Sequence, residues 1–176
     1  MATRNILNAD DPTLRKHSRI VTDFNNRLHV LLDDMRETLI EANGLGLAAP
    51  QVGVLRRAVL IVDFVEQTVE ANDEESDEER LPEYKEEIIE LVNPEIIAKS
   101  GEQSGSEGCL SVPGVYGIVK RPELVKVKAQ DRNGNSFELF RKGLTARAIC
   151  HEIDHLNGLI FTSLAERFLS EEDERV

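Results

Sequence analysis

The sequence predicts an α+β fold in which antiparallel strands pack around one central helix. Two segments, residues 22–44 and 143–156, repeat apolar residues at helical spacing. Residues 122–140 instead alternate apolar and polar residues on both sides of an Asn-Gly pair. That pair is typical of a hairpin turn, which joins antiparallel strands. Several such strands with two helices indicate an α+β architecture.

The first helical segment predicts an amphipathic N-terminal helix. Before it, DDPTLRK (residues 10–16) predicts a turn into an extended segment. Thr22 or Asp23 is expected to cap the helix at its start, and Gly44 to end it. Its apolar stripe predicts core packing. The stripe contains Phe24, Leu28, Leu31, Leu32, Met35 and Leu39.

The middle of the chain predicts strands separated by an acidic loop. RRAVLIVDF (residues 56–64) is typical of a buried strand. Residues 66–87 lose the apolar pattern and contain eleven acidic and two basic residues, which predicts a solvated loop insertion. Residues 88–92 and 95–99 are apolar again, with Pro94 expected to limit the ladder between them.

The second helix, Gly143 to Leu156, is expected to be buried. One stripe contains Leu144, Ala148, His151 and His155, and a roughly opposite stripe contains Ile149, Ile153 and Leu156. Because a surface helix has only one apolar face, two such stripes predict a helix in the middle of the domain. The following SLAERFL predicts a short C-terminal helix, and residues 170–176 a flexible charged tail.

Length and composition predict a single cytoplasmic domain spanning residues 1–176. The net charge of −12 argues against a nucleic-acid groove and against adhesion to an anionic membrane. No segment has the length of a membrane span, and the first residues lack the apolar region of a signal peptide. In a reducing compartment the two cysteines, Cys109 and Cys150, are expected to stay free.

The sequence HEIDH on the second helix points to a metal site. His151 and His155 are four residues apart and share one face. A lone buried histidine is usually hydrogen-bonded in the core, but two on one stripe would each need a separate polar partner. Glu152 is placed to take a proton from water, as in metal-dependent hydrolases.

The motif lacks a third ligand. His17 and His29 stand in no motif, whereas Cys109 lies in SEGCLSVPG, in a context that presents a thiol from a strand or turn. Cys109 is therefore the favoured third ligand, although free cysteine is more often a small buried apolar residue. Cys150 is expected to pack in the core.

A glycine-rich segment, GLGLAAPQVG (residues 44–53), completes the set of motifs. Its glycines permit close backbone approach, and the amide of Gln51 can donate to an oxygen. A phosphate-binding loop fits less well, because no lysine follows.

Taken in order, GLGLAAPQ, EGCLS and HEIDH resemble the peptide deformylase family, over roughly residues 5 to 165. The resemblance implies a hydrolase that removes the N-formyl group from the N-terminal methionine of new polypeptides and releases formate. It also implies one divalent metal ion, natively Fe²⁺, for which Zn²⁺, Ni²⁺ or Co²⁺ can substitute. The implied partners are N-formyl-methionyl nascent peptides and, transiently, the ribosome.

The resemblance also assigns roles to individual residues. The implied metal ligands are Cys109, His151 and His155. Catalysis is assigned to Glu152 as general base and then acid, and to the Gln51 amide and the Leu110 N–H as donors to the oxyanion. Backbone groups of three residues are implied to pair with an extended peptide substrate; these are Leu45, Gly46 and Gly108.

Three further expectations concern the surroundings of the site. Glu107 is expected to support it from behind the ligands. Leu144 and Ala148 lie on the histidine stripe and are expected to line an apolar pocket for methionine. Two positions depart from the family pattern, which often has glutamine at Cys150 and in some members arginine at Tyr116.

Two other functions compete with deformylation. A zinc endopeptidase would share HEIDH, but EGCLS and GLGLAAPQ argue against it. A non-catalytic metal-binding module would not need Glu152 or Gln51. Activity on a formylated peptide compared with its acetylated twin separates all three.

Overall fold

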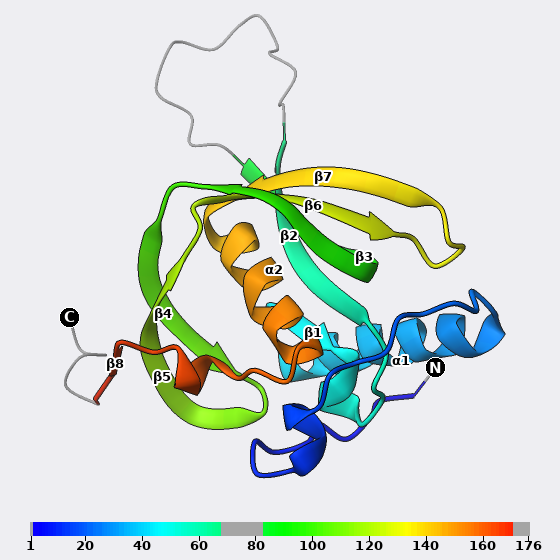
Figure 1. Cartoon of the computed structure of the whole chain (residues 1–176), viewed down its shortest axis with the longest axis horizontal. Coiled ribbons are helices and arrows are strands. Elements are labelled where there is room, and N and C mark those ends of the chain that lie inside the picture. Colours follow the sequence, from blue (N-terminus) through cyan, green and yellow to red (C-terminus); the bar gives the residue numbers. More distant parts are fainter. Residues whose placement is uncertain (1, 68–82, 171–176) are drawn as a thin grey trace, which may run out of the picture.

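A computed structural model describes residues 2–67 and 83–170, and its architecture is α+β, as predicted. Two antiparallel sheets flank a central helix, α2 (Figure 1). The larger sheet has the order β1-β2-β3-β6-β7 and contains β1 (Gly46–Ala48), β2 (Ala58–Gln67), β3 (Glu83–Ser100), β6 (Leu124–Gln130) and β7 (Ser136–Lys142). The smaller sheet has the order β4-β5-β8 and contains β4 (Gln103–Cys109), β5 (Val112–Arg121) and β8 (Arg167–Phe168).

Two α-helices and three short 3₁₀ helices complete the fold. The helices are α1 (Asn26–Ala42), α2 (Gly143–Leu156), η1 (Pro12–Arg15), η2 (Ala49–Val52) and η3 (Phe161–Ser163). α2 has the bounds that the sequence predicts. The turn expected at residues 10–16 is η1, where the side chain of Asp11 accepts from Thr13 N at 2.8 Å. No described helix is long and apolar enough to cross a membrane.

The larger sheet carries a hydrophobic core on each of its faces. Alternate residues of a strand point to opposite faces. In β2, Val59 and Ile61 pack with α2, whereas Ala58 and Leu60 pack with α1. The predicted stripe of α1 thus packs as core, and α2 is buried in the middle of the molecule, between the two sheets (Figure 1).

The first helix begins later than predicted. Its N-cap is Asn25, not Thr22 or Asp23. Val21 explains the difference, because its N–H donates to Asn93 Oδ1 at 2.8 Å and its carbonyl accepts from Asn93 Nδ2 at 2.9 Å. These bonds hold the chain extended just before the helix. The helix ends at Asn43 in the left-handed conformation, one residue before the predicted Gly44.

The two strands predicted around Pro94 form one continuous strand, β3. Asn93 takes a positive φ of 51° and the ladder shifts register between Val92 and Glu95. Asn93 also donates from its backbone to Arg57 O at 2.7 Å. The register shift thus accommodates Pro94, which has no N–H to donate, without ending the strand.

The acidic loop predicted at 66–87 is shorter in the structure, because β2 and β3 pair as far as Gln67 and Glu83. Strand pairing gives the backbone there hydrogen-bond partners, despite the charged composition. The remaining residues of this prediction, 68–82, lie outside the described residues, as does the predicted flexible tail beyond Ser170.

The predicted short C-terminal helix is wrong. Residues of SLAERFL form the end of η3 and the strand β8. β8 pairs with β5, and Leu169 N donates to Tyr116 O at 2.9 Å. The open edge of the smaller sheet supplies backbone partners that outweigh the local helical pattern.

Candidate active site

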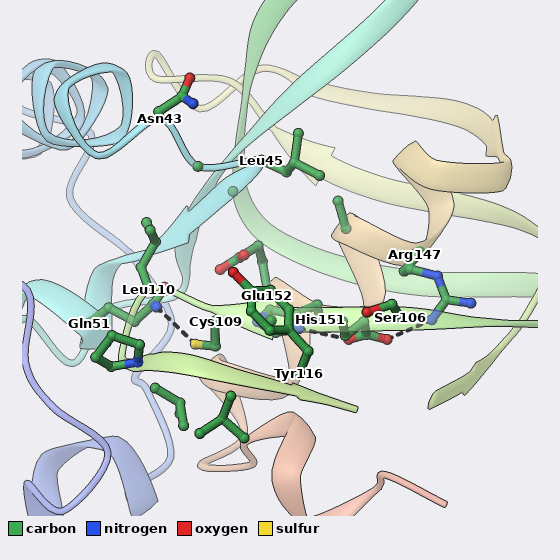
Figure 2. A pocket seen from close by; sticks show the side chains of 18 of the residues that line it. Asn43, Leu45, Gln51, Ser106, Cys109, Leu110, Tyr116, Arg147, His151 and Glu152 are labelled. Carbon is green, nitrogen blue, oxygen red and sulfur yellow. Dashed lines mark hydrogen bonds and ion pairs between the residues drawn. The ribbon is translucent and has the colours of Figure 1, made fainter. Parts of the chain in front are cut away.

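The candidate site is a cavity of about 440 Å³ where three parts of the chain meet. The segment into β1 contributes Asn43 to Gly46, the β4–β5 region contributes residues 106–110 and 112–116, and α2 contributes one side. Figure 2 shows four side chains converging on the site: Gln51 from η2, Cys109 from the end of β4, and His151 and Glu152 from α2. All three motifs of the sequence therefore line one cavity.

Cys109, His151 and His155 lie close enough to hold one metal ion. A ligand atom from each lies within 4.8 Å of the others, and Cys109 Sγ is 3.3 Å from His155 Nε2. Cys109 ends β4, whereas the histidines lie one turn apart on α2 with ring centroids separated by 4.9 Å. His29, which the sequence analysis set aside as a ligand, lies elsewhere, and its ring contacts Arg132 O at 2.8 Å.

The chemistry of this group fits a divalent transition metal. One thiolate and two imidazoles are ligands that suit zinc and iron. Two buried atoms at the site, Glu152 Oε2 and His155 Nδ1, have no hydrogen-bond partner among the described residues. Cys150 is not part of this group and packs in the hydrophobic core, where burial raises the pKa of its thiol to about 11.

Glu152 is a buried carboxylate at the cavity. It is 4% exposed, and burial raises its pKa to about 7. A Cβ atom at Gly46 would lie 2.5 Å from Glu152 Oε1, so only glycine leaves room for this carboxylate. A group that changes protonation state near neutrality is suited to accept and return a proton.

The amide of Gln51 is held in one orientation. Its Oε1 accepts from Ala48 N at 2.8 Å, so Nε2 points to Cys109 Sγ at 3.5 Å and to Ser111 Oγ at 3.2 Å. η2 begins with Ala49 and Pro50, and its short turn places Gln51 at the cavity, where Leu110 also lies. The cavity thus has an N–H donor beside the sulfur.

Glu107 lies behind the histidines and binds three cationic or imidazole side chains. Glu107 Oε1 is 2.7 Å from His151 Nδ1, and its two oxygens accept from Arg121 and Arg147. Burial alone would favour the neutral acid, but the bonds with Arg121 and His151 lower its pKa to about 2. The resulting carboxylate fixes the His151 ring, so its Nε2 is left for a ligand on the cavity side.

The two histidines differ in their electrostatics. Burial favours a neutral His151, but its contacts with Cys109 and Glu107 raise its pKa to about 10. Burial lowers the pKa of His155 to about 3, and the nearby His151 adds to this effect. Burial thus favours the neutral form of His155, which is the form in which an imidazole binds a metal ion.

The residues predicted to contact substrate all line the cavity. Leu45, Gly46 and Gly108 lie on its walls, with Leu144 and Ala148 on α2. β1 and β4 are edge strands of their sheets, so each has an unpaired side. The carbonyl of Leu45 already accepts from Val62 N at 2.8 Å. The backbone group of Leu45 that remains to pair with a peptide is therefore its N–H.

Tyr116 packs directly over the glycine at this wall. A Cβ atom on Gly108 would lie 2.7 Å from Tyr116 Cε1. Tyr116 is 44% exposed and borders the cavity (Figure 2). This departure from the family pattern therefore lies beside the candidate substrate wall.

The sequence analysis missed Arg121, Arg147 and Ser111. Arg147 lies four residues before His151 on the same buried helix. A charged residue at that spacing must be paired, which is a signal that sequence reasoning could have used. Ser111 is the last residue of EGCLS and was given no role there, whereas Arg121 lies in no recognisable motif.

Comparisons with known proteins agree with this geometry. The model of the family described as Polypeptide deformylase matches residues 3–169. A peptide deformylase of Caldicellulosiruptor bescii is 51% identical over 173 residues, covering 98% of this chain and 92% of that protein. Peptide deformylase 1 of Bacillus subtilis is 43% identical over 173 residues, covering 98% and 96%.

Solved structures give the same result. A peptide deformylase crystal structure from Legionella pneumophila matches with a TM-score of 0.77 at 42% identity, over 98% of this chain and 89% of that one. A Met-Ala-Ser-bound class I type b peptide deformylase from Acinetobacter baumannii matches with a TM-score of 0.79 at 33% identity, over 93% and 98%. The chain therefore belongs to the polypeptide deformylase family.

Proposed function

We propose that this chain, as one catalytic domain, removes the N-formyl group from the N-terminal methionine of newly made polypeptides and releases formate. The observation that carries the proposal is Glu152, a buried carboxylate at the cavity beside Cys109 and two histidines. One of its oxygens has no hydrogen-bond partner in the part of the chain that the structure describes. Since polypeptides are made in the cytoplasm, the proposed activity places the chain there.

Cys109, His151 and His155 would hold one divalent metal ion, Fe²⁺ natively, with Zn²⁺, Ni²⁺ or Co²⁺ as substitutes. When bound, such an ion polarises a carbonyl oxygen and lowers the pKa of water. The donor set of one thiolate and two imidazoles supports this assignment.

Glu152 moves the proton in the proposed reaction. It takes a proton from the water that attacks the formyl carbon and then gives it to the nitrogen of the departing methionine. The C–N bond breaks, formate leaves and the peptide keeps a free amine. A pKa raised to about 7 by burial supports both steps, because neither protonation state is strongly favoured at neutral pH.

Gln51 Nε2 and the N–H of Leu110 donate to the oxygen of the formyl group as its negative charge develops. The bond from Ala48 N to Gln51 Oε1 fixes the amide, so no reorientation is needed during the reaction. Loss of one such donor typically raises the barrier by about 2.7–4 kcal/mol.

The peptide lies extended between the edge strands β1 and β4, pairing with backbone groups of Leu45, Gly46 and Gly108. Leu144 and Ala148 line the pocket for the methionine side chain. The Acinetobacter baumannii structure named for bound Met-Ala-Ser supports a peptide beginning with methionine. Because the substrate is nascent, the chain meets the ribosome transiently.

The test compares N-formyl-Met-Ala-Ser with N-acetyl-Met-Ala-Ser. Gly46 approaches Glu152 so closely that an added Cβ would lie 2.5 Å from its Oε1, and we expect the acetyl methyl to tilt the carbonyl there. Misplacement by about 1 Å can cost ~10²-fold in rate. We expect kcat/KM to be at least ~10²-fold higher for the formyl peptide. Similar rates on both would contradict deformylation, and cleavage at an internal bond would indicate an endopeptidase.

A second test concerns the metal. Cys109→Ser is expected to lose metal and activity together, because a hydroxyl is a much poorer ligand than a thiolate. The measurement is metal content of protein purified without oxygen, alongside the rate on the formyl peptide. A variant with full metal and full rate would exclude Cys109 as a ligand.

A further inference from the structure

We propose that Arg147 is a positioning residue that holds the two halves of the metal site in register. One half is Cys109 at the end of β4, and the other is the histidine pair on α2. The inference rests on the metal site proposed above. It concerns a side chain that meets the ligands only through other groups.

Arg147 reaches from α2 to the smaller sheet. Its side chain is 7% exposed. Nη1 donates to Val119 O at 2.9 Å and to Gly105 O at 3.4 Å, and Nη2 donates to Gln103 O at 3.4 Å. One guanidinium therefore binds the backbones of both β4 and β5. At Gly105 an added Cβ would lie 3.0 Å from Nη2, so glycine there provides the space for this contact.

The same guanidinium also binds the carboxylate that orients a ligand. Arg147 Nη1 donates to Glu107 Oε2 at 2.8 Å, while Glu107 Oε1 contacts His151 Nδ1 at 2.7 Å. Arg121, from β5, binds both oxygens of Glu107 at 2.8 and 2.9 Å. Each oxygen of Glu107 thus has two partners, which leaves the carboxylate no freedom to rotate.

A second ion pair crosses the same boundary. Arg121 Nη1 donates to Asp154 Oδ2 at 2.6 Å, which joins β5 to the last turn of α2. Around this boundary, two arginines therefore face two carboxylates, those of Glu107 and Asp154. Without Arg147, Glu107 Oε2 keeps only Arg121, and three strand carbonyls lose a donor. The carboxylate can then turn toward Arg121 and take the His151 ring with it.

A positioning role for Arg147 can be distinguished from a role in stabilising the fold alone. Partners behind metal ligands typically change metal affinity or activity by about 10–100-fold when mutated. A buried arginine that only stabilised the fold would lower the melting temperature without changing the metal. Arg132 offers the matched comparison, because it joins Glu90 on β3 to Asp33 on α1 and is not among the residues that line the site.

The experiment uses the Co²⁺-loaded full chain, prepared without oxygen, as wild type, Arg147→Met, Arg147→Lys and Arg132→Met. Visible absorption reports the ligand geometry, and competition with a chelator gives the affinity for Co²⁺. We expect Arg147→Met to lose about 10–100-fold in affinity and to shift the absorption bands. Its kcat should fall more than its KM changes, because Arg147 borders the cavity but the backbone groups proposed to pair with the peptide are unaltered. Arg147→Lys keeps the charge but not the planar fork, so it should recover part of the loss.

Arg132→Met should lower the melting temperature but keep the wild-type spectrum and affinity. If Arg147→Met matches Arg132→Met in both, the inference is overturned. If Arg147→Met does not fold, a shifted spectrum in Arg147→Lys supports the inference, and an unshifted one overturns it. A wild-type chain that binds no Co²⁺ at all would instead remove the proposed metal site, and the inference with it.

Discussion

The two helices cover opposite faces of one sheet, yet only α2 carries the candidate chemistry. α1 packs one apolar stripe against the sheet and exposes Val30 and Ile40. Its buried polar residues, Asp34 and Thr38, bind the N-terminal segment, through Arg4 and Ala2. α2 is buried on nearly every side. A polar side chain on such a helix needs a partner, and the partners of the polar residues on α2 form the site.

The helices also begin differently. Asn25 caps α1 through its own side chain, which accepts from Arg27 N at 3.0 Å. Lys142 at the start of α2 makes no such bond. There, Gly143 N donates to Glu123 O at 2.9 Å, and Gly143 O accepts from Gln103 Nε2 at 2.7 Å. The start of α1 is therefore fixed locally, and that of α2 by the rest of the fold.

The largest expected difference between substitutions on the two helices is in kcat for a formyl peptide. Glu152→Gln on α2 should retain metal, because Glu152 is not one of the three ligands. It should lower kcat on a formyl peptide by on the order of 10²–10⁴-fold, the usual cost of losing a general base. Glu41→Gln, an exposed position on α1, should leave kcat unchanged. Metal content and kcat are measured for both. A metal-free Glu152→Gln variant would show that the carboxylate helps to hold the ion.

The next difference concerns what each core supports. Leu32 on α1 and Ile149 on α2 are both fully buried. Truncation of either to alanine should lower the free energy of unfolding by about 2–5 kcal/mol, measured by urea denaturation. Leu32→Ala should keep the wild-type kcat when folded. Ile149→Ala should lower kcat, because the helix that carries the histidines loses part of its packing against the sheet. Equal kcat in the two variants would contradict a special role for the packing of α2.

The sequence predicted the bounds of α2 better than those of α1. The bounds of α2 and the stripe that carries its histidines followed from periodicity, because burial on two sides leaves a clear pattern. The start of α1 did not, because Asn93, far away in the chain, holds Val21 extended. No local propensity contains that contact.

The residues of the candidate site also divide into those that the local sequence predicts and those that depend on contacts between distant segments. Cys109, His151, Glu152 and Gln51 stand in motifs, and their joint position at one cavity was expected. Of the charged residues that lie behind these four, the sequence predicted only Glu107. Arg121 and Arg147 come from two different elements and meet only because β5 and α2 pack together. C-terminal residues were misassigned for a similar reason, since the edge of β5 decides their conformation.

The smallest expected effect tests how the helices begin. In Asn25→Ala, two N–H groups at the start of α1 lose their shared acceptor, since Asn25 Oδ1 lies 3.0 Å from Arg27 N and 3.4 Å from Leu28 N. The backbone carbonyl of Asn25 still accepts from Leu28 and His29, so the helix should remain. We expect a loss of about 1 kcal/mol in the free energy of unfolding, as for other N-cap truncations. Lys142→Ala, the matched change before α2, should cost less than about 0.5 kcal/mol, because an exposed side chain with no cap bond is removed. Urea denaturation of both variants gives the two values. A larger loss for Lys142→Ala than for Asn25→Ala would mean that α2 also depends on its own first residues, and that its start is not fixed by Glu123 and Gln103.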